Sequence, residues 1–235
     1  MEHEVHFSWF HFIPVLRDYP NHIVAAGLVA VILVVFSLLA RLALTFAKPE
    51  SILIPPPKLS FLGFFDLVVE GIYKLTESVL GKDARKFVPV AGALFLYIFI
   101  SNLLGLLPGF TPPTDNVNTT LACGIFVFLY YNYKGFQTGG IHYLKHFLGP
   151  VWYLAWLLLP IELISHAVRP FTLALRLRGN MVGDHTVLSM FTQLVPYGVP
   201  VAVYFLGLLV CFIQAFVFVM LSMVYITMAR DSDHH

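Results

Sequence analysis

Long apolar stretches recur along the chain and predict about five membrane-crossing helices. A helix that spans the hydrocarbon layer needs about 20 largely apolar residues. The stretches that meet this pattern lie at 23–47, 86–109, 117–133, 151–191 and 201–229, after an outer N-terminal segment at 1–22. The third is the weakest, because Asn and Thr side chains occupy its leading edge. The pattern predicts an all-α polytopic membrane protein that forms a single integral membrane domain over 1–235.

A different pattern precedes the second of these helices, at 60–80. Acidic and basic side chains follow one helical stripe, formed by Asp66, Glu70, Lys74 and Glu77. Apolar side chains follow another, formed by Phe61, Phe65, Val68, Ile72, Leu75 and Val79. This arrangement predicts an amphipathic helix that lies in the membrane interface rather than crossing it. A partner helix that covers the apolar stripe is the alternative.

The last two apolar stretches are too long for upright helices. At 1.5 Å per residue, 151–191 would extend for about 60 Å and 201–229 for about 43 Å, whereas the hydrocarbon layer is about 30 Å thick. Either Pro160 and Pro170 break the first helix, or the two helices are strongly tilted. The sequence Pro196-Tyr-Gly-Val-Pro200 predicts a turn between them. We therefore expect a long, strongly tilted helical hairpin.

The distribution of Lys and Arg predicts the orientation of the chain. Seven of these residues lie between Arg41 and Lys86, but only Arg17 precedes them. The 109–120 loop has none, and Arg230 lies in the C-terminal tail. Basic residues accumulate on the cytoplasmic side of membrane proteins. The N-terminus is therefore expected outside and the C-terminus in the cytoplasm.

Composition excludes most other classes of protein. Hydrophobic residues make up 58% of the 235 residues and charged residues only 11%, with a mean hydropathy of +0.80. A soluble domain has about 25% charged residues. The balance of 14 basic and 13 acidic residues gives no sign of nucleic-acid binding. The histidines lack metal-ligand spacing and no phosphate-binding loop is present, so we expect no metal, no cofactor and no direct contact with ATP.

The few charges inside the 151–191 helix are the most informative residues of the chain. Each would cost about 2.5–3.5 kcal/mol at the centre of a bilayer. At 100° per residue, one stripe lies within about 40° of Arg176. It consists of Glu162, Ser165, Arg169, Thr172, Arg176 and Asn180. Arg178 and His185 lie on the opposite face, and Asp184 lies between the two.

Arg176 can act only as a fixed positive charge, because an arginine keeps its proton at any accessible pH. It divides the polar stripe into an inner part and an outer part, and it would block the leakage of cations along the stripe. It also offers a counter-ion to a carboxylate. No carboxylate of this chain is obviously placed to meet it, which predicts that the partner belongs to another subunit.

The polar stripe has several interpretations. Buried salt bridges that fix helix packing would explain it without any transport. An ion or proton pathway explains its length better. A secondary ion transporter or free-standing ion channel would explain the charges, but not the overlong hairpin or the absence of an inverted repeat. An intramembrane enzyme that uses Glu162, Asp184 and His185 and a purely structural scaffold are further alternatives.

The segment Pro170-Phe-Thr-Leu-Ala-Leu-Arg-Leu-Arg-Gly-Asn-Met181 resembles the signature of subunit a of F-type ATP synthases. Further matches are Asn102-Leu-Leu-Gly-Leu-Leu-Pro108, the loop from Pro113 to Leu121, Gln214-Ala-Phe-Val-Phe218 and Tyr225-Ile-Thr-Met-Ala229. The resemblance extends from about Phe61 to Ala229. It implies a non-catalytic stator subunit of a rotary motor, which couples proton flow to the rotation of a ring of c subunits and thereby to ATP synthesis.

The resemblance also implies roles for individual residues. Arg176 matches the essential arginine at the interface with the c-ring, where two aqueous half-channels meet. The implied inner half-channel contains Glu162, Ser165 and Arg169. The implied outer half-channel contains Asp115, Asn116, Asn180, Asp184, His185 and Gln214.

Some positions depart from the family pattern. Arg178 stands where the family often has Phe, and His185 stands where many members have Glu. Gly207 stands where some members have a His that complements that Glu, and Asn116 stands where Asp is frequent. The outer path is therefore expected to depend on Asp115, Asp184 and His185.

The resemblance implies partners and a location as well. The expected partners are the c-ring, b-type subunits of the peripheral stalk, the remainder of the ATP synthase and the lipid bilayer. The expected location is the bacterial plasma membrane, with an organellar membrane as the alternative. The choice between proton and sodium depends largely on the c subunit.

Overall fold

The computed structural model describes residues 19–46, 61–107, 110–140, 155–194 and 198–231. Throughout these ranges the long elements are α-helices, and no strand occurs in them. The helices are α1 (Asn21–Phe46), α3 (Phe61–Leu80), α4 (Ala84–Gly105), α5 (Val117–Gly139), α7 (Ala155–Leu194) and α8 (Val199–Asp231). Two short 3-10 helices precede α4 and α5, namely η2 (Gly81–Asp83) and η3 (Pro113–Asp115). The expected all-α fold is confirmed.

Two helices end at other residues than the sequence predicts. The second predicted helix was expected to reach residue 109, but α4 ends at Gly105. The third was expected to end at residue 133, but α5 continues to Gly139 and stops at Gly140, whose φ of 52° favours glycine. Most of the predicted N-terminal segment, the start of the 151–191 stretch and residues 195–197 of the predicted turn lie outside the described residues.

Within the described ranges, three segments are long and apolar enough to cross a membrane. They are Asn21–Leu42, Ala84–Gly105 and Pro200–Arg230. The chain is therefore a polytopic helical membrane protein. α5 and α7 carry more polar side chains than these three, so the expectation of five crossings stays a prediction.

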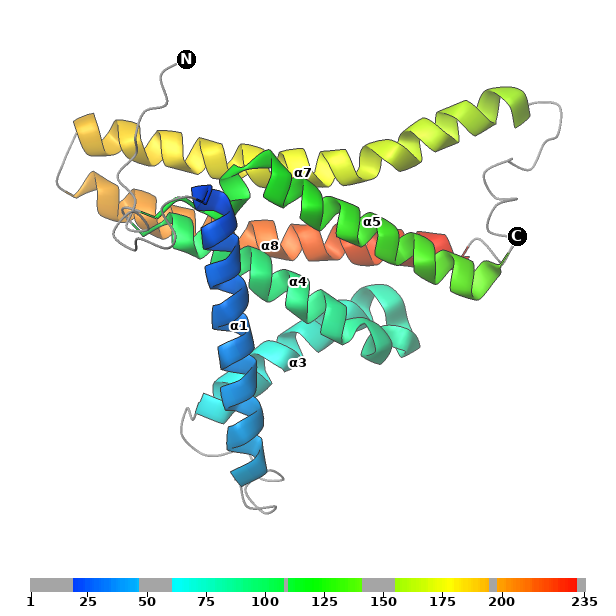
Figure 1. The fold of residues 1–235 in the computed structure, drawn as a ribbon, viewed down its shortest axis with the longest axis horizontal. Helices are drawn as coiled ribbons and strands as arrows, with labels where there is room; N and C mark the ends of the chain where they lie inside the picture. Colours follow the sequence, from blue (N-terminus) through cyan, green and yellow to red (C-terminus); the bar gives the residue numbers. More distant parts are fainter. Residues whose placement is uncertain (1–18, 47–60, 108–109, 141–154, 195–197, 232–235) are drawn as a thin grey trace.

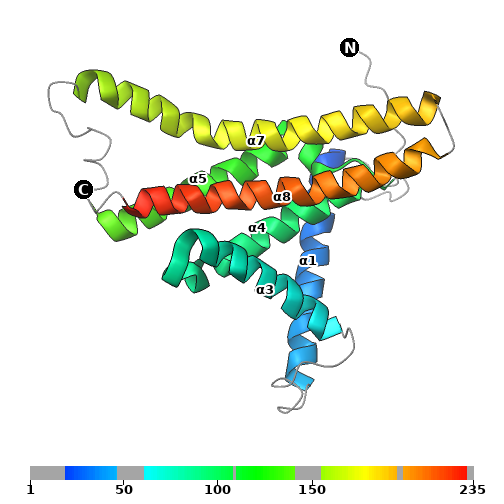
Figure 2. The same ribbon diagram turned by 180° about the vertical axis from the view of Figure 1, so that it is seen from behind.

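The two overlong stretches form one continuous hairpin. α7 extends over 40 residues and contains both Pro160 and Pro170, so neither proline ends the helix. α8 runs beside it in the opposite direction over 33 residues. Both helices lie across the direction of α1 in the two views (Figures 1 and 2). Of the two interpretations of their length, the tilted hairpin is the one that fits this arrangement.

The main hydrophobic core lies where α4, α5, α7 and α8 meet. Its fully buried side chains include Ile98, Tyr131, Leu177, Phe218 and Met223. Near its start α1 joins the bundle through Ala25 and Val29, which pack near Leu104, and it also contacts α3. The remainder of α1 exposes a continuous apolar surface, as expected for a helix in contact with lipid.

The amphipathic helix α3 has the two faces that the sequence predicts. Asp66, Glu70, Lys74 and Glu77 are all exposed, and the Lys74 ammonium lies 2.7 Å from the Glu70 carboxylate. The apolar side chains of Val68, Ile72, Leu75 and Val79 pack against the core. The chain's own helices therefore cover much of the apolar face, in line with the predicted alternative of a covering helix. The position of α3 in the membrane interface stays a prediction.

An ion cluster links the end of α8 to the turn between α3 and α4. The Asp83 carboxylate accepts hydrogen bonds from the Lys86 ammonium, at 2.8 Å, and from the Arg230 guanidinium. Arg230 also lies over the Phe87 ring, 5.6 Å from its centroid. Lys86 and Arg230 lower the pKa of Asp83 from 3.8 to about 2, since both cations stabilise the carboxylate.

α5 approaches α7 very closely at one glycine. A Cβ atom added to Gly124 would lie 2.5 Å from the carbonyl oxygen of Pro170. Because the obstacle is backbone, the two helices would have to separate to make room. Glycine at this position is therefore required by the distance between α5 and α7.

We expect Gly124→Ala to lower the thermal unfolding midpoint of the purified protein. Overpacking of this kind costs about 1–3 kcal/mol, which exceeds the gain of about 1 kcal/mol from replacing glycine by alanine in a helix. The matched control is Gly27→Ala in α1, where an added Cβ meets no atom within 4 Å. Equal midpoints for the two variants would contradict the close approach of α5 and α7.

We expect Asp83→Asn to lower the unfolding midpoint near pH 6. The depressed native pKa means that the ion cluster contributes stability above pH 3.8 and loses it as the pH falls toward about 2. The difference between wild type and variant should therefore shrink over that interval. Asp66→Asn, which alters an exposed carboxylate of α3, is the control. A difference that stays constant down to pH 2 would exclude the ion cluster as its source.

Candidate functional site

The predicted polar stripe of α7 lies on an open face of the helix. Glu162 and Arg169 are half-buried, whereas Ser165, Thr172, Arg176 and Asn180 are exposed. Leu173, Ala174, Leu177 and Met181 form the buried face of the same helix, toward the core. The helical angles expected from the sequence therefore correspond to a real division between a polar stripe and a packed face.

Arg176 lies near the middle of this stripe, between exposed apolar side chains. Leu175 is 60% exposed and Phe171 is 54% exposed. Within the described part of the chain, the Arg176 guanidinium has neither an ion-pair partner nor a hydrogen-bond partner. The protein thus presents a permanent cation on an apolar surface and provides no counter-ion for it among these residues.

The inner part of the stripe contacts α8 through an aromatic ring. The Arg169 guanidinium lies 5.2 Å from the centroid of the Tyr225 ring. A cation over a ring face is attracted by the ring quadrupole. Glu162 and Ser165 lie on the same face of α7 as Arg169, two turns and one turn before it respectively.

The outer part of the stripe is bonded directly to α8. The Asn180 side-chain amide donates a hydrogen bond to Oε1 of Gln214. Gln214 is only 3% exposed, and its Nε2 has no hydrogen-bond partner among the described residues. The sequence prediction placed both residues in the outer path, and the structure brings them together.

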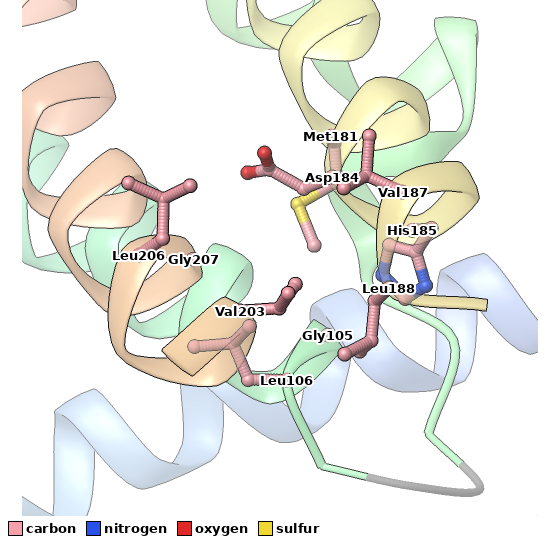
Figure 3. A pocket seen from close by; sticks show the side chains of 10 residues that line it. All are labelled: Gly105, Leu106, Met181, Asp184, His185, Val187, Leu188, Val203, Leu206 and Gly207. Atoms are coloured by element: carbon pink, nitrogen blue, oxygen red, sulfur yellow. The ribbon is translucent and has the colours of Figure 1, made fainter. Parts of the chain in front are cut away.

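Asp184 and His185 line a small cavity between α7, α8 and the end of α4 (Figure 3). Its volume of about 20 Å³ is sufficient for one water molecule. In Figure 3 the Asp184 carboxylate points toward Leu206 and Gly207 of α8, whereas the His185 ring points toward Gly105 of α4. The two side chains therefore reach different walls of one cavity.

Two glycines keep this cavity open. A Cβ atom on Gly105 would lie 2.9 Å from Nε2 of His185 and 2.9 Å from Cβ of Pro112. A Cβ atom on Gly207 would lie 2.8 Å from a methyl carbon of Leu106. Larger side chains at either position would occupy the space next to Asp184 and His185.

Asp115 and Asn116 do not line the cavity. Asp115 is exposed in η3, and its backbone carbonyl accepts a hydrogen bond of 3.1 Å from Nε of Arg178. The Asn116 side chain accepts from the backbone N–H of Asn118 at 2.9 Å, as an N-cap of α5. The structure therefore gives Asn116 a local structural role in addition to the predicted one.

Three interactions near the site were not predicted from the sequence. Arg178, which had no assigned role, holds the loop that contains Asp115. Thr114 donates a buried hydrogen bond of 2.8 Å to Oδ1 of Asn102, which holds the same loop to α4. His166 bonds to α5. Each bond joins two residues that are 12 or more positions apart in the sequence. Helical periodicity does not reveal contacts of this kind.

Comparisons with known proteins cover nearly the whole chain. The model of the family described as ATP synthase A chain matches residues 24–227. A protein of Bdellovibrio bacteriovorus named ATP synthase subunit a is 44% identical over 229 residues, which are 97% of this chain and 99% of that protein. Proteins of the same name are 44% identical in Trichlorobacter lovleyi and 42% identical in Geobacter sulfurreducens, over 91% and 92% of this chain and 89% and 93% of those proteins.

We expect the Asn180–Gln214 bond to appear as a coupling energy between α7 and α8. Asn180→Ala and Gln214→Ala should each lower the stability of the purified protein, because each leaves the other amide without its partner. The double variant should be less destabilised than the sum, with a coupling of about 0.5–3 kcal/mol. Chemical unfolding of the four proteins measures it, and strict additivity would exclude the bond. Asn118→Ala, an exposed side chain of α5, is the control.

Proposed function

Because the chain belongs to the ATP synthase A chain family, we propose that it is the non-catalytic stator subunit that conducts protons through a rotary F-type ATP synthase. In this role, two half-channels and one fixed arginine couple proton flow across the membrane to rotation of a c-ring. ATP synthesis itself takes place elsewhere in the complex.

The observation that carries the proposal is the position of Arg176. A charge within the apolar layer costs about 2.5–3.5 kcal/mol unless it is paired or hydrated. Arg176 is exposed beside Leu175 and Phe171, without a counter-ion among the described residues. A carboxylate on a neighbouring subunit would satisfy it. A ring of c subunits, each with a membrane-embedded carboxylate, supplies such groups in succession.

The exposed surface of the hairpin supports a ring-shaped partner at this face. Apolar side chains surround the stripe on α7 and continue on α8, where Phe205 is 72% exposed. A ring of apolar helices could slide over such a surface without breaking hydrogen bonds. A single cation in an otherwise apolar surface would then attract one ring carboxylate at a time.

Protons would reach Arg176 from outside through the outer path and leave through the inner path. The proposed outer path passes Asp115 and Asn116, then Asp184 and His185, then Asn180 and Gln214. The proposed inner path contains Arg169, Ser165 and Glu162. Arg176 separates the two paths, because its fixed charge repels a proton that would pass directly. Each charge that crosses releases about 2.3 kcal/mol per 100 mV of membrane potential.

The proposed setting is a bacterial plasma membrane, with the N-terminus outside and the C-terminus in the cytoplasm. The excess of Lys and Arg between Arg41 and Lys86 supports this orientation. The proposed partners are the c-ring, b-type subunits of the peripheral stalk and the remainder of the ATP synthase.

We expect Arg176→Ala to abolish ATP synthesis driven by a proton gradient in vesicles that contain the whole complex. The variant should also increase passive proton leakage, because the fixed charge is the barrier between the two paths. Arg176→Lys keeps a charge but loses the planar fork that binds a carboxylate through two bonds, and should therefore retain little synthesis.

Arg85→Ala is the matched control, since it removes an exposed arginine at the start of α4. It should retain normal coupling between proton flow and ATP synthesis. Normal coupled synthesis by Arg176→Ala would refute the proposal. Gradient-driven ion flux through the purified chain alone would favour a free-standing channel instead.

A further inference from the structure

His166 is a buried polar residue of α7 that is held by α5. It is 7% exposed and precedes Arg169 by three residues. Its Nε2 lies 2.9 Å from Oδ1 of Asn132. The Tyr131 hydroxyl lies 3.4 Å from its Nδ1 and 3.3 Å from its Nε2. Two neighbouring side chains of one helix thus bind a single imidazole of another.

The hydrogen-bond directions in this cluster follow from the position of Asn132. The Asn132 amide nitrogen donates to the carbonyl of Phe128 at 2.7 Å, so its Oδ1 is the atom that faces His166. A carbonyl oxygen only accepts, and His166 therefore carries a proton on Nε2. The Tyr131 hydroxyl lies at nearly equal distances from the two ring nitrogens and contacts the same imidazole.

Aromatic contacts connect this cluster to Arg169. The rings of Tyr131 and His166 meet edge to face, with centroids 5.2 Å apart. The Tyr131 ring lies 6.0 Å from the Tyr225 ring of α8, over which the Arg169 guanidinium is placed. His166 and Arg169 are therefore fixed by the same group of side chains from α5 and α8.

The cluster lies beside Pro170, one of the two prolines inside α7. Pro170 has no N–H, so the carbonyl of His166 lacks the helical hydrogen bond that residue 170 would otherwise donate. α5 also approaches α7 closely at this proline, through Gly124. The side chain of His166 is thus bonded to α5 where the backbone of His166 has lost a bond within α7.

Pro170 also divides the polar stripe. Glu162, Ser165 and Arg169 precede it, whereas Arg176 and Asn180 follow it. A change in the bend of α7 at this point would rotate one group of side chains relative to the other. The alignment of the two groups therefore depends on the contacts that hold α7 rigid around Pro170.

We propose that His166, together with Asn132 and Tyr131, is a positioning residue that fixes the inner part of the polar stripe relative to Arg176 on the other side of Pro170. The inference rests on the proposed function, because the two groups it aligns are the proposed inner path and the proposed ring-facing arginine. His166 transfers no proton in this role. Its effect is to hold the bend of α7 at Pro170.

The test measures the aqueous accessibility of the two halves of the stripe separately. Ser165→Cys and Asn180→Cys are introduced one at a time into a chain that carries Cys123→Ala and Cys211→Ala. The complete ATP synthase is assembled in membrane vesicles, and the rate of thiol modification by a small water-soluble methanethiosulfonate is measured. The rates are compared with and without His166→Ala.

We expect His166→Ala to change the modification rate at Ser165→Cys by about three- to tenfold, the range that loss of one neutral hydrogen bond permits. The rate at Asn180→Cys should stay the same. ATP-driven proton pumping should decrease relative to ATP hydrolysis. His166→Gln should restore both, because its amide can donate to Oδ1 of Asn132. Thr138→Ala, which removes an exposed side-chain bond from α5, is the matched control.

An unchanged rate at Ser165→Cys, or equal changes at both cysteines, would show that His166 does not position the stripe. If His166→Ala does not assemble, Tyr131→Phe removes one hydroxyl from the same cluster and keeps the ring, and the same criteria apply. Unreactive cysteines in the parent complex would instead contradict the proposed water paths, and the role of His166 with them. Reactive cysteines that do not respond to His166 would leave the proposed function intact.

Discussion

A permanent cation on an apolar helix face is the constraint on which the remainder of this structure depends. Arg176 cannot lose its proton, and lipid cannot solvate it. In the proposed function, the opposite side of α7 must therefore be held firmly enough to keep the guanidinium within reach of a carboxylate on another subunit. Leu173, Leu177 and Met181 provide this hold, since all three are buried against the bundle. The packed face of α7 therefore determines where the open face, and Arg176 on it, is located.

The length of α7 follows from the same requirement. A helix of 40 residues is about 60 Å long, twice the thickness of the hydrocarbon layer. When such a helix lies obliquely, positions along one stripe differ in both depth and lateral position. The two ends of the stripe can then approach opposite membrane surfaces at separate points. An upright helix would stack them in one line and join the two proposed paths.

Periodicity predicted the elements of this fold well, because the membrane imposes a strict relation between sequence pattern and helix. The hairpin, the amphipathic α3 and the open face around Arg176 all follow from apolar length and helical angle. The effect of Pro170 did not follow from the sequence, which permitted either a break or a tilt. In the structure α7 continues through Pro170, and α5 packs against it there through Gly124, a residue 46 positions away in the sequence.

Individual site residues were predicted less well, since a helical angle defines a face but not its neighbours. Asn180 and Gln214 were both expected in the outer path, and they form one hydrogen bond. Asn116 was expected there too, which stays a prediction, and its side chain caps α5. The sequence pattern predicted no role for His166. Its partners on α5 come from a tertiary contact that no local pattern contains.

The chemistry of the outer polar residues gives water a place in the proposed path. The Arg176 guanidinium keeps its proton, and the Asn180 amide does not titrate, so neither can pass a proton on to Asp184. An ordered water can bridge polar groups that do not touch one another. The cavity beside Asp184 and His185 has room for one. The glycines at 105 and 207 therefore matter to the proposed path as much as its titratable side chains, because they preserve the space that a water needs.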